Sequence, residues 1–325
     1  MDTRFTSLEI GAGVGGQALG LARASFDPVL VIDNDPHACR TLRLNQPGWN
    51  VLELDFNEFV GAEHGIETVD LISGGLPSQP YSVAGKQQGT KDDRDLLRAS
   101  IRLATELQPR AVLLETTPSL LMPKFVGVRT NVEEELKLLG YTWSWMVLDA
   151  QNFGVPQTRK SCLLVAMRLD DFVFFEWPSP VSEAGASVGE VLRDSMASRG
   201  WPFADAWASR ANRVAPTIVG GSKNHGGADL GPTRTKQQWL ELAVNGHSLG
   251  DDVPAPDFEF DPSLGRHGVP KLTVEQIMLL QGLSPDWVVT GGKTARYKQV
   301  AQAVPPPLAE AVGRRIATAL ARGPR

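Results

Sequence analysis

The sequence has no apolar segment of the length that a membrane helix needs. A bilayer span takes about 20 consecutive apolar residues, and no stretch of this 325-residue chain approaches that length. The N-terminal segment Met-Asp-Thr-Arg-Phe-Thr also lacks the apolar block of a signal peptide. We therefore expect no membrane association and a cytoplasmic location.

Cysteine is almost absent, which excludes a disulfide-stabilised domain. The two cysteines, Cys39 and Cys162, are too few for a disulfide framework. Each lies in an apolar periodic segment, where cysteine typically serves as a small buried hydrophobe. His225 has no metal-ligating neighbour in the sequence, and we predict no metal site.

An excess of positive charge is also missing. The formal net charge of −5 argues against a protein that coats nucleic acid nonspecifically, but it allows one local basic face. Between residues 193 and 236 the balance is +4, from seven basic and three acidic residues. This segment is a candidate for phosphate contacts, although a charge run is also typical of a solvated surface.

What is present is the pattern of an α/β protein. The composition, 42% hydrophobic and 21% charged, is that of an ordinary globular chain with one large or two modest domains. Short β-rich apolar runs alternate with helical patterns, and we predict strands at 7–10, 29–32, 51–54, 71–73, 111–114, 143–148 and 163–167. This alternation predicts a doubly wound parallel sheet.

The composition changes after about residue 176. Proline, glycine, serine and aspartate become frequent and long periodic runs become rare, which indicates a smaller, irregular domain. A helical pattern returns from Lys271, with a final helix predicted over 307–320. We therefore divide the chain into one domain of 1–175 plus 268–325 and a second domain of 176–267.

A glycine-rich turn marks a ligand site in the first domain. Gly-Ala-Gly-Val-Gly-Gly at 11–16 follows a predicted strand and opens a helical pattern, and Asp33 ends the next strand. Glycines let the backbone turn tightly against a nucleotide-type ligand, and a carboxylate after the second strand accepts hydrogen bonds from a ribose diol. The turn alone does not choose between NAD and S-adenosylmethionine.

Several motifs in order resemble those of one enzyme family. Residues 74–82 read Gly-Gly-Leu-Pro-Ser-Gln-Pro-Tyr-Ser, similar to the Gly-Gly-x-Pro-Cys-Gln-x-Phe/Tyr-Ser loop of DNA cytosine-5 methyltransferases, with Ser78 at the cysteine position. The segments at 153–159, 280–283 and 299–306 resemble that family's Tyr-Gly-Val-Pro-Gln-x-Arg, Leu-Gln-Gly-Phe and Gln-x-Gly-Asn-Ala-Val-Pro-Pro. The chain thus resembles a divergent member, with a Rossmann-like methyltransferase sheet and a target-recognition domain at 176–267.

The resemblance implies that the cofactor is S-adenosylmethionine. Asp33 takes the acidic ribose position, and Asp55 takes the position that meets the adenine amino group. The other residues at cofactor positions are Gly11, Gly13, Gly16, Asn34, Phe56, Pro77, Gln302 and Val304. Gly11 stands where the family usually has phenylalanine, so an aromatic contact worth roughly 0.5–1.5 kcal/mol in ring pairs is absent.

The resemblance also implies a reaction on a cytosine flipped out of duplex DNA. In the family a cysteine thiolate attacks C6, which makes C5 nucleophilic toward the methyl group. Glu115 corresponds to the glutamate that pairs with the exocyclic amine and N3, and Arg159 to the arginine that supports the loop and the base O2. Gln79 belongs to the reacting loop, and Lys86 and Arg94 are predicted to contact DNA.

Ser78 changes this chemistry. A hydroxyl is several pKa units less acidic than a thiol and attacks poorly unless a base removes its proton, so we expect impaired C5 transfer. Other departures are Thr116-Thr117 for Asn-Val, Ser161 for the second arginine of Gln-x-Arg-x-Arg, and Ala301-Gln302 for Gly-Asn. They favour natural divergence over an engineered Cys→Ser change, and both explanations stay open.

Two alternatives to C5 transfer remain at this point. Ser78-Gln79-Pro80-Tyr81 resembles the Ser-Pro-Pro-Tyr loop of amino-methyltransferases, in which transfer to cytosine N4 needs no covalent adduct. The other alternative is a catalytically silent DNA-binding or regulatory homologue.

The predicted partner is double-stranded DNA, and a protein partner or companion restriction enzyme is left open. Loops of the second domain carry Arg213, Lys223, Asn224 and Arg234 as candidate DNA contacts. Arginine and asparagine side chains can hydrogen-bond to the edges of guanine and adenine. The alternative interpretation, that these are flexible solvated loops, is equally favoured for any one of them.

Overall fold

The computed structural model describes residues 3–76, 96–181, 185–219 and 227–324, which fall into two compact units. Unit 1 consists of Met1–Leu148, Lys160–Ser179 and Leu308–Arg325, and unit 2 of Asp149–Arg159 and Pro180–Pro307. This division differs from the one drawn from composition, because the segments 149–159 and 268–307 pack with the irregular region. The assignment of catalysis and target recognition to separate domains stays a prediction.

Unit 1 is built on a seven-stranded sheet of order β3-β2-β1-β4-β5-β7-β6. Its strands are β1 (Phe5–Ile10), β2 (Phe26–Asp33), β3 (Val51–Glu53), β4 (Leu71–Gly75), β5 (Ala111–Thr116), β6 (Tyr141–Asp149) and β7 (Lys160–Arg168). All seven predicted strands are present, with ends that differ by a few residues. The predicted α/β class is confirmed.

The sheet is mixed rather than wholly parallel, which corrects the sequence prediction. Strands β3, β2, β1, β4 and β5 are parallel, whereas β7 is antiparallel to β5. A parallel return needs a crossover of about a dozen residues or more. The segment 150–159 between β6 and β7 holds only the short 3-10 helix η5 (Ala150–Phe153), so the chain turns back instead.

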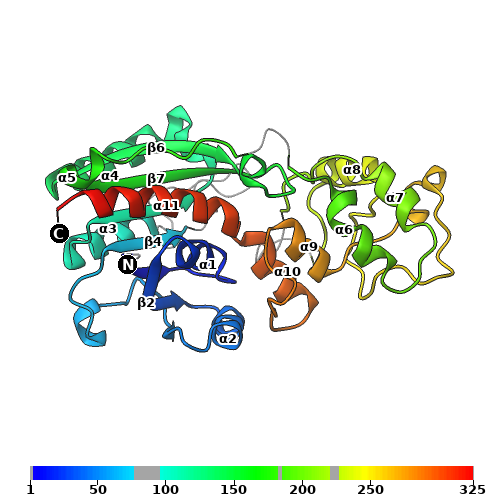
Figure 1. Cartoon of the computed structure of the whole chain (residues 1–325), viewed down its shortest axis with the longest axis horizontal. Helices are drawn as coiled ribbons and strands as arrows, with labels where there is room; N and C mark the ends of the chain where they lie inside the picture. The colour runs from blue at the N-terminus through cyan, green and yellow to red at the C-terminus, as the bar shows by residue number, and fades with distance from the viewer. Residues whose placement is uncertain (1–2, 77–95, 182–184, 220–226, 325) are drawn as a thin grey trace. The chain divides into compact units, whose positions relative to one another are not determined.

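Helices cover both faces of this sheet. The helices are α1 (Gly16–Arg23), α2 (Pro36–Asn45), α3 (Leu96–Leu107), α4 (Val126–Leu138), α5 (Leu169–Phe172) and α11 (Pro306–Arg322), with 3-10 helices η1 (Gly61–His64), η3 (Pro118–Leu121) and η4 (Pro123–Phe125). Side chains of α1 and α11 pack on one face, and side chains of α3 and α4 on the other. The final helix predicted over 307–320 is confirmed as α11 (Figure 1).

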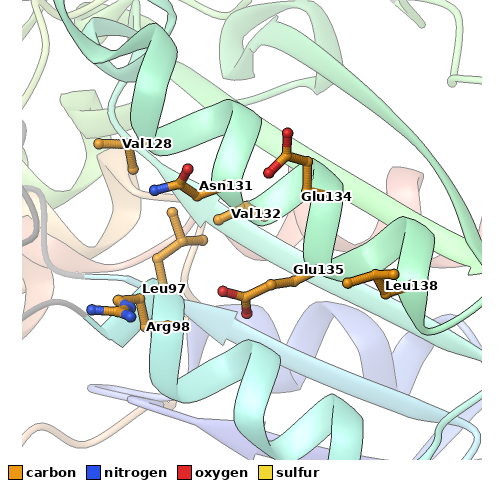
Figure 2. Close-up of a pocket in the computed structure, with 8 residues that line it drawn as sticks. All are labelled: Leu97, Arg98, Val128, Asn131, Val132, Glu134, Glu135 and Leu138. Carbon is orange, nitrogen blue, oxygen red and sulfur yellow. The ribbon is translucent and has the colours of Figure 1, made fainter.

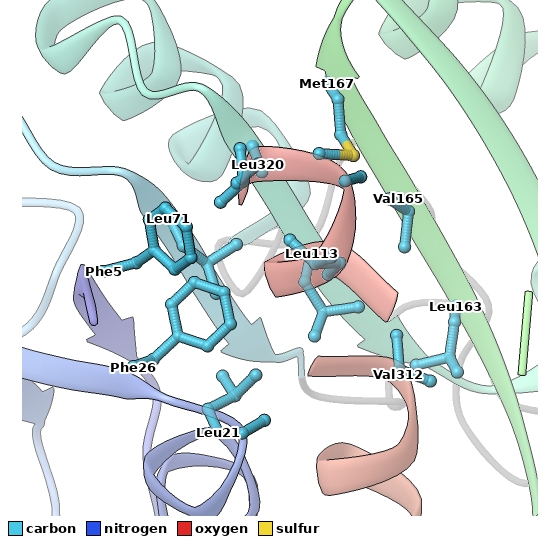
Figure 3. Close-up of a cluster of buried hydrophobic side chains, with 14 residues drawn as sticks. Phe5, Leu21, Phe26, Leu71, Leu113, Leu163, Val165, Met167, Val312 and Leu320 are labelled. Atoms are coloured by element: carbon cyan, nitrogen blue, oxygen red, sulfur yellow. The ribbon is translucent and has the colours of Figure 1, made fainter. Parts of the chain in front are cut away.

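The two ends of the chain meet in one hydrophobic cluster. Phe5 and Phe26, from the first two strands, share this cluster with Val312 and Leu320 of α11 and with Leu163 of β7 (Figure 3). Each of these side chains is at most 5% exposed, and burying one contributes about 1.5–3 kcal/mol. Helix α11 is therefore an integral layer of unit 1, although nearly 300 residues separate it from β1.

Unit 2 has short helices joined by long loops. They are α6 (Val188–Ala197), α7 (Ala204–Arg210), α8 (Thr233–Glu241), α9 (Val274–Leu280) and α10 (Lys293–Gln302), with the 3-10 helix η6 (Pro262–His267). Helix α9 packs against α6 and α10, which explains why 268–307 joins this unit. Trp207 and Trp239 are fully buried in its core. Among the described residues, no helix combines the length and apolar character that a membrane crossing requires.

Candidate active site

The carboxyl ends of four parallel strands bring the predicted site residues of unit 1 to one edge of the sheet. Gly11 follows β1, Asp33 ends β2, and Glu115 lies near the end of β5. Strand pairing aligns Ile10 with Gly74 and Gly75 with Glu115. Ligands of open α/β sheets bind at this edge.

The glycine turn uses a backbone conformation that other residues rarely adopt. Gly11, Gly13 and Gly15 have φ values of 58°, 54° and 89°, all in the left-handed region. A Cβ atom at Gly11 would lie 3.3 Å from the carbonyl oxygen of Gly75. The local backbone thus favours glycine at position 11.

Asp33 holds this turn in place. Its Oδ2 accepts a hydrogen bond from the amide of Gly13 at 2.7 Å, and its Oδ1 accepts one from the amide of Asp35 at 2.7 Å. The side chain bridges the end of β2 to the loop after β1. Its contact with a ribose stays a prediction, as does that of Gly16, the first residue of α1.

The remaining cofactor candidates of unit 1 differ in exposure. Asn34 is exposed, and Asp55 Oδ1 accepts hydrogen bonds from the backbone and side chain of Asn57. Phe56 is only 4% exposed and packs in a core cluster. Their contacts with the cofactor stay predictions.

Glu115 has a specific hydrogen-bond partner in the neighbouring strand. Ser161 Oγ donates to Glu115 Oε1 at 2.5 Å. The backbone carbonyl of Glu115 accepts from the amide of Leu76 at 2.8 Å, immediately before the segment that contains Ser78. The structure therefore places the predicted base-pairing carboxylate beside the strand that leads into the reacting loop.

A second carboxyl group, missed by the sequence analysis, lies beneath the glycine turn. Glu9 of β1 is 2% exposed, and burial raises its pKa to about 7, opposed by the hydrogen bond from Ser73. Ser73 Oγ donates to Glu9 Oε2 at 2.6 Å and accepts from Gln17 Nε2 at 2.8 Å. The signal in the sequence was a glutamate inside an apolar strand, Leu8-Glu9-Ile10.

Neither cysteine can replace Ser78 as nucleophile. Cys39 and Cys162 are both fully buried, which confirms the interpretation made from the sequence. Burial, and then the negative charge of Asp33, raises the pKa of Cys39 to about 12. Burial, and then the charge of Glu115, raises the pKa of Cys162 to about 12. Because thiolates are the reactive form, both thiols are inert at neutral pH.

Within unit 2, the segments that carry the family resemblance meet in a buried network. Gln157, fully buried, donates to the carbonyl oxygen of Leu280 at 3.0 Å and also to Gln281 Oε1, and it accepts from the amide of Ile218 at 3.0 Å. Gln281 Nε2 donates to the carbonyl oxygen of Val300 at 2.7 Å. The matched motifs are thus physically connected.

Arg159 extends this network. Its Nη1 donates to the carbonyl oxygens of Ala301 at 3.1 Å and Ile218 at 3.3 Å. The contacts show a side chain that ties helix α10 to the segment around Ile218. Its contact with a base O2 stays a prediction.

The other described candidates of unit 2 differ in exposure: Arg213, Arg234 and Gln302 lie at the surface, and Val304 is buried. Arg213 forms an ion pair with Glu241 at 3.1 Å, and Arg234 is exposed on α8. Gln302, the last residue of α10, is exposed, whereas Val304 is buried. The candidates Pro77, Ser78, Gln79, Lys86, Arg94, Lys223 and Asn224 lie outside the described residues.

A separate cavity of about 200 Å³ lies between α3 and α4 (Figure 2). Leu97 and Arg98 contribute from α3, and Val128, Asn131 and Glu135 from α4. No predicted site residue lines it. We therefore assign it no part in the site at the strand ends.

Comparison with known proteins identifies the same family as the motifs. The model of the family described as C-5 cytosine-specific DNA methylase matches residues 5–318. The chain is 44% identical over 317 residues to Type II methyltransferase M.NaeI of Lentzea aerocolonigenes, covering 96% of this chain and 75% of the relative. It is 43% identical over 320 residues to Type II methyltransferase M.NgoMIV of Neisseria gonorrhoeae, covering 98% of each.

Solved structures share the fold at low sequence identity. The methyltransferase EhMeth of Entamoeba histolytica superposes with a TM-score of 0.68 at 12% identity, covering 97% of this chain and 98% of the other. A mutant of DNMT2 from Spodoptera frugiperda gives 0.65 at 14%, covering 97% and 99%. With its motifs, strand-end geometry and family match in agreement, the chain belongs to the C-5 cytosine-specific DNA methylase family.

Proposed function

We propose that this protein is an S-adenosylmethionine-dependent DNA methyltransferase that acts on a flipped cytosine in duplex DNA, with C5 transfer impaired by Ser78. The carrying observation is the gathering of the glycine turn, Asp33 and Glu115 at the carboxyl edge of parallel strands. One edge then provides both a cofactor cradle and a carboxylate for the base.

The glycine turn fits a bound cofactor. A Cβ atom at Gly13 would meet no other atom of the described residues within 4 Å, so the described part of the chain leaves space on that side of the turn. Asp33 fixes the turn, and Asp55 follows the adjacent strand β3. These residues would hold S-adenosylmethionine, which supplies an electrophilic methyl group when bound.

Glu115 is the residue that would recognise the cytosine. An ionised carboxylate accepts hydrogen bonds from an exocyclic amine, and a protonated one donates to a ring nitrogen. Ser78 would face the same base with a hydroxyl group. Because the described residues include no thiolate that could take over, the reaction depends on this weak nucleophile.

The comparisons do not favour the two alternatives raised by the sequence. The matched family model describes C-5 cytosine-specific methylation, and the relatives at 43–44% identity are named methyltransferases. Transfer to N4 and a silent regulatory role therefore have no specific observation in their support.

The test measures transfer of labelled methyl groups from S-adenosylmethionine to unmethylated bacterial DNA, followed by nucleoside analysis. We expect a low yield of 5-methylcytosine, none with S78A, and at least about a 100-fold gain with S78C, the lower end of what a single catalytic group contributes. N4-methylcytosine as the product, or no gain with S78C, would contradict the proposal.

A further inference from the structure

The Glu115 carboxyl group is held by a hydroxyl group from the neighbouring antiparallel strand. Glu115 of β5 is paired with Leu163 of β7, and Ser161 lies two residues before Leu163. Side chains alternate along a strand, so Ser161 emerges on the same face as Leu163 and Glu115. Such diagonal neighbours are within reach of a long side chain, and the 2.5 Å Oγ to Oε1 distance shows that they meet.

The surroundings make this hydrogen bond rigid and shielded. Ser161 is 1% exposed, and its strand neighbour Cys162 is fully buried. Leu114, which precedes Glu115, is 1% exposed. Both strands are thus fixed in the core at this point. Glu115 itself is half-buried, so it stays partly open to solvent. At this largely buried position, water competes little with the hydrogen bond between Ser161 and Glu115.

We propose that Ser161 is a positioning residue. It orients the Glu115 carboxyl group and leaves that group able to take up and release a proton during the reaction. The catalytic meaning of this proposal rests on the proposed function, whereas the hydrogen bond itself does not. A hydroxyl donor favours the ionised carboxylate, but a neutral donor is roughly half as strong as a charged one. Serine at this position therefore orients Glu115 and stabilises its anion less than an arginine would.

The charge of Glu115 also acts on a titratable group of the neighbouring strand. Burial, and then the charge of Glu115, raises the pKa of the Cys162 thiol of β7. Arg129 of α4 acts on the same thiol in the opposite sense. Its guanidinium also donates to the carbonyl oxygens of Leu120 and Met122. Because Ser161 Oγ itself bonds the Glu115 carboxyl, a change at Ser161 is expected to act directly on Glu115.

Thr116 offers a matched control on the adjacent position of β5. It is 4% exposed, and its Oγ1 has no hydrogen-bond partner within the described residues. T116V removes a buried hydroxyl that bonds nothing, whereas S161A removes one that bonds Glu115. S161T keeps the hydroxyl and serves as the conservative rescue.

The kinetic test compares kcat and KM of these variants for methyl transfer to DNA. We expect S161A to lower kcat about 3- to 10-fold, the range that one net hydrogen bond gives. KM for DNA should stay unchanged, and the pH profile should move to higher pH. T116V should match the unchanged protein, and S161T should recover most of kcat. Equal kcat and pH profiles for S161A and T116V would overturn the proposal.

A second measurement works without any activity. Carbon-13 NMR of glutamate-labelled protein follows the Glu115 carboxyl through a pH titration, with E115Q to assign the signal. We expect a higher Glu115 pKa in S161A and a lower one in S161R, with no change in T116V. Inactivity of all variants would count against the proposed function alone. An unchanged Glu115 pKa in both Ser161 variants would refute the positioning role.

Discussion

The two units bury polar side chains in different ways. In unit 1 the chain Gln17, Ser73 and Glu9 ends on a carboxyl group that burial keeps largely protonated up to about neutral pH. In unit 2 the network of Gln157 and Gln281, which the guanidinium of Arg159 extends, joins amides and backbone carbonyls and contains no carboxyl group. Both networks lie beside predicted functional segments, but only the first can respond to pH.

Because only Glu9 among these network residues titrates, the pH dependence of stability should arise in unit 1. A raised carboxyl pKa means that the folded state binds a proton that the unfolded state has already released. The contribution of Glu9 to stability is therefore fully present below about pH 4.5 and is lost as pH rises to about 7. Unit 2 has no such group in its network, so its network should be equally stable across this range.

Placing a carboxylate into the network of unit 2 is the largest expected perturbation. In Q157E the donor to Leu280 O and Gln281 Oε1 becomes an acceptor that faces acceptors. Leaving a buried charge without compensation costs about 3–5 kcal/mol. We expect that loss in urea unfolding at pH 8 and a smaller loss at pH 5, with increased hydrogen exchange in unit 2. A pH-independent loss would show that the introduced carboxyl does not titrate there.

Removing the carboxyl from unit 1 is the reciprocal change. E9Q keeps the shape of the protonated acid but cannot ionise. A pKa of about 7 against an ordinary 4.5 corresponds to about 3 kcal/mol at most. We expect E9Q to be more stable than the unchanged protein by up to that amount at pH 8 and to match it at pH 4.5. A constant difference at both pH values would mean that Glu9 is not the titrating group.

The strands and the glycine turn of unit 1 could be predicted from the sequence. The seven strands followed from apolar runs, because strands of a sheet covered on both faces are apolar nearly throughout. The direction of β7 could not be predicted from apolar runs, because it depends on the path of the segment 150–159. The glycine turn was readable because its residues are contiguous, and Asp33 because it follows the next strand.

Contacts between distant segments were out of reach of the sequence. Ser161 and Glu115 are 46 residues apart, and only the register of β5 against β7 brings them together. The pair of Gln157 and Gln281 spans 124 residues. The sequence singled out the motifs that contain these residues but assigned them by resemblance. Their hydrogen bonds depend on pairings that no local pattern contains.

The smallest expected effect concerns backbone conformation. G13A adds a Cβ that meets no atom of the described residues within 4 Å, so the expected effect comes from the backbone and not from crowding. Its φ of 54° lies in the left-handed region, which costs a non-glycine residue about 1–2 kcal/mol. The matched control is G48A in unit 1, where φ lies outside the left-handed region and a Cβ also meets no described atom within 4 Å.

We expect urea unfolding to show a loss of about 1–2 kcal/mol for G13A and less than about 0.5 kcal/mol for G48A, at pH 5 and at pH 8 alike. Equal small losses would mean that the turn relaxes to another conformation. In that case the amide of Gly13 would no longer have to meet Asp33, and binding of S-adenosylmethionine, measured by calorimetry, would report the change. If the turn keeps its geometry under strain, G13A should instead bind the cofactor almost normally while the fold loses stability. The reason is that free and bound protein then share the same strained backbone, so the strain does not change the binding free energy.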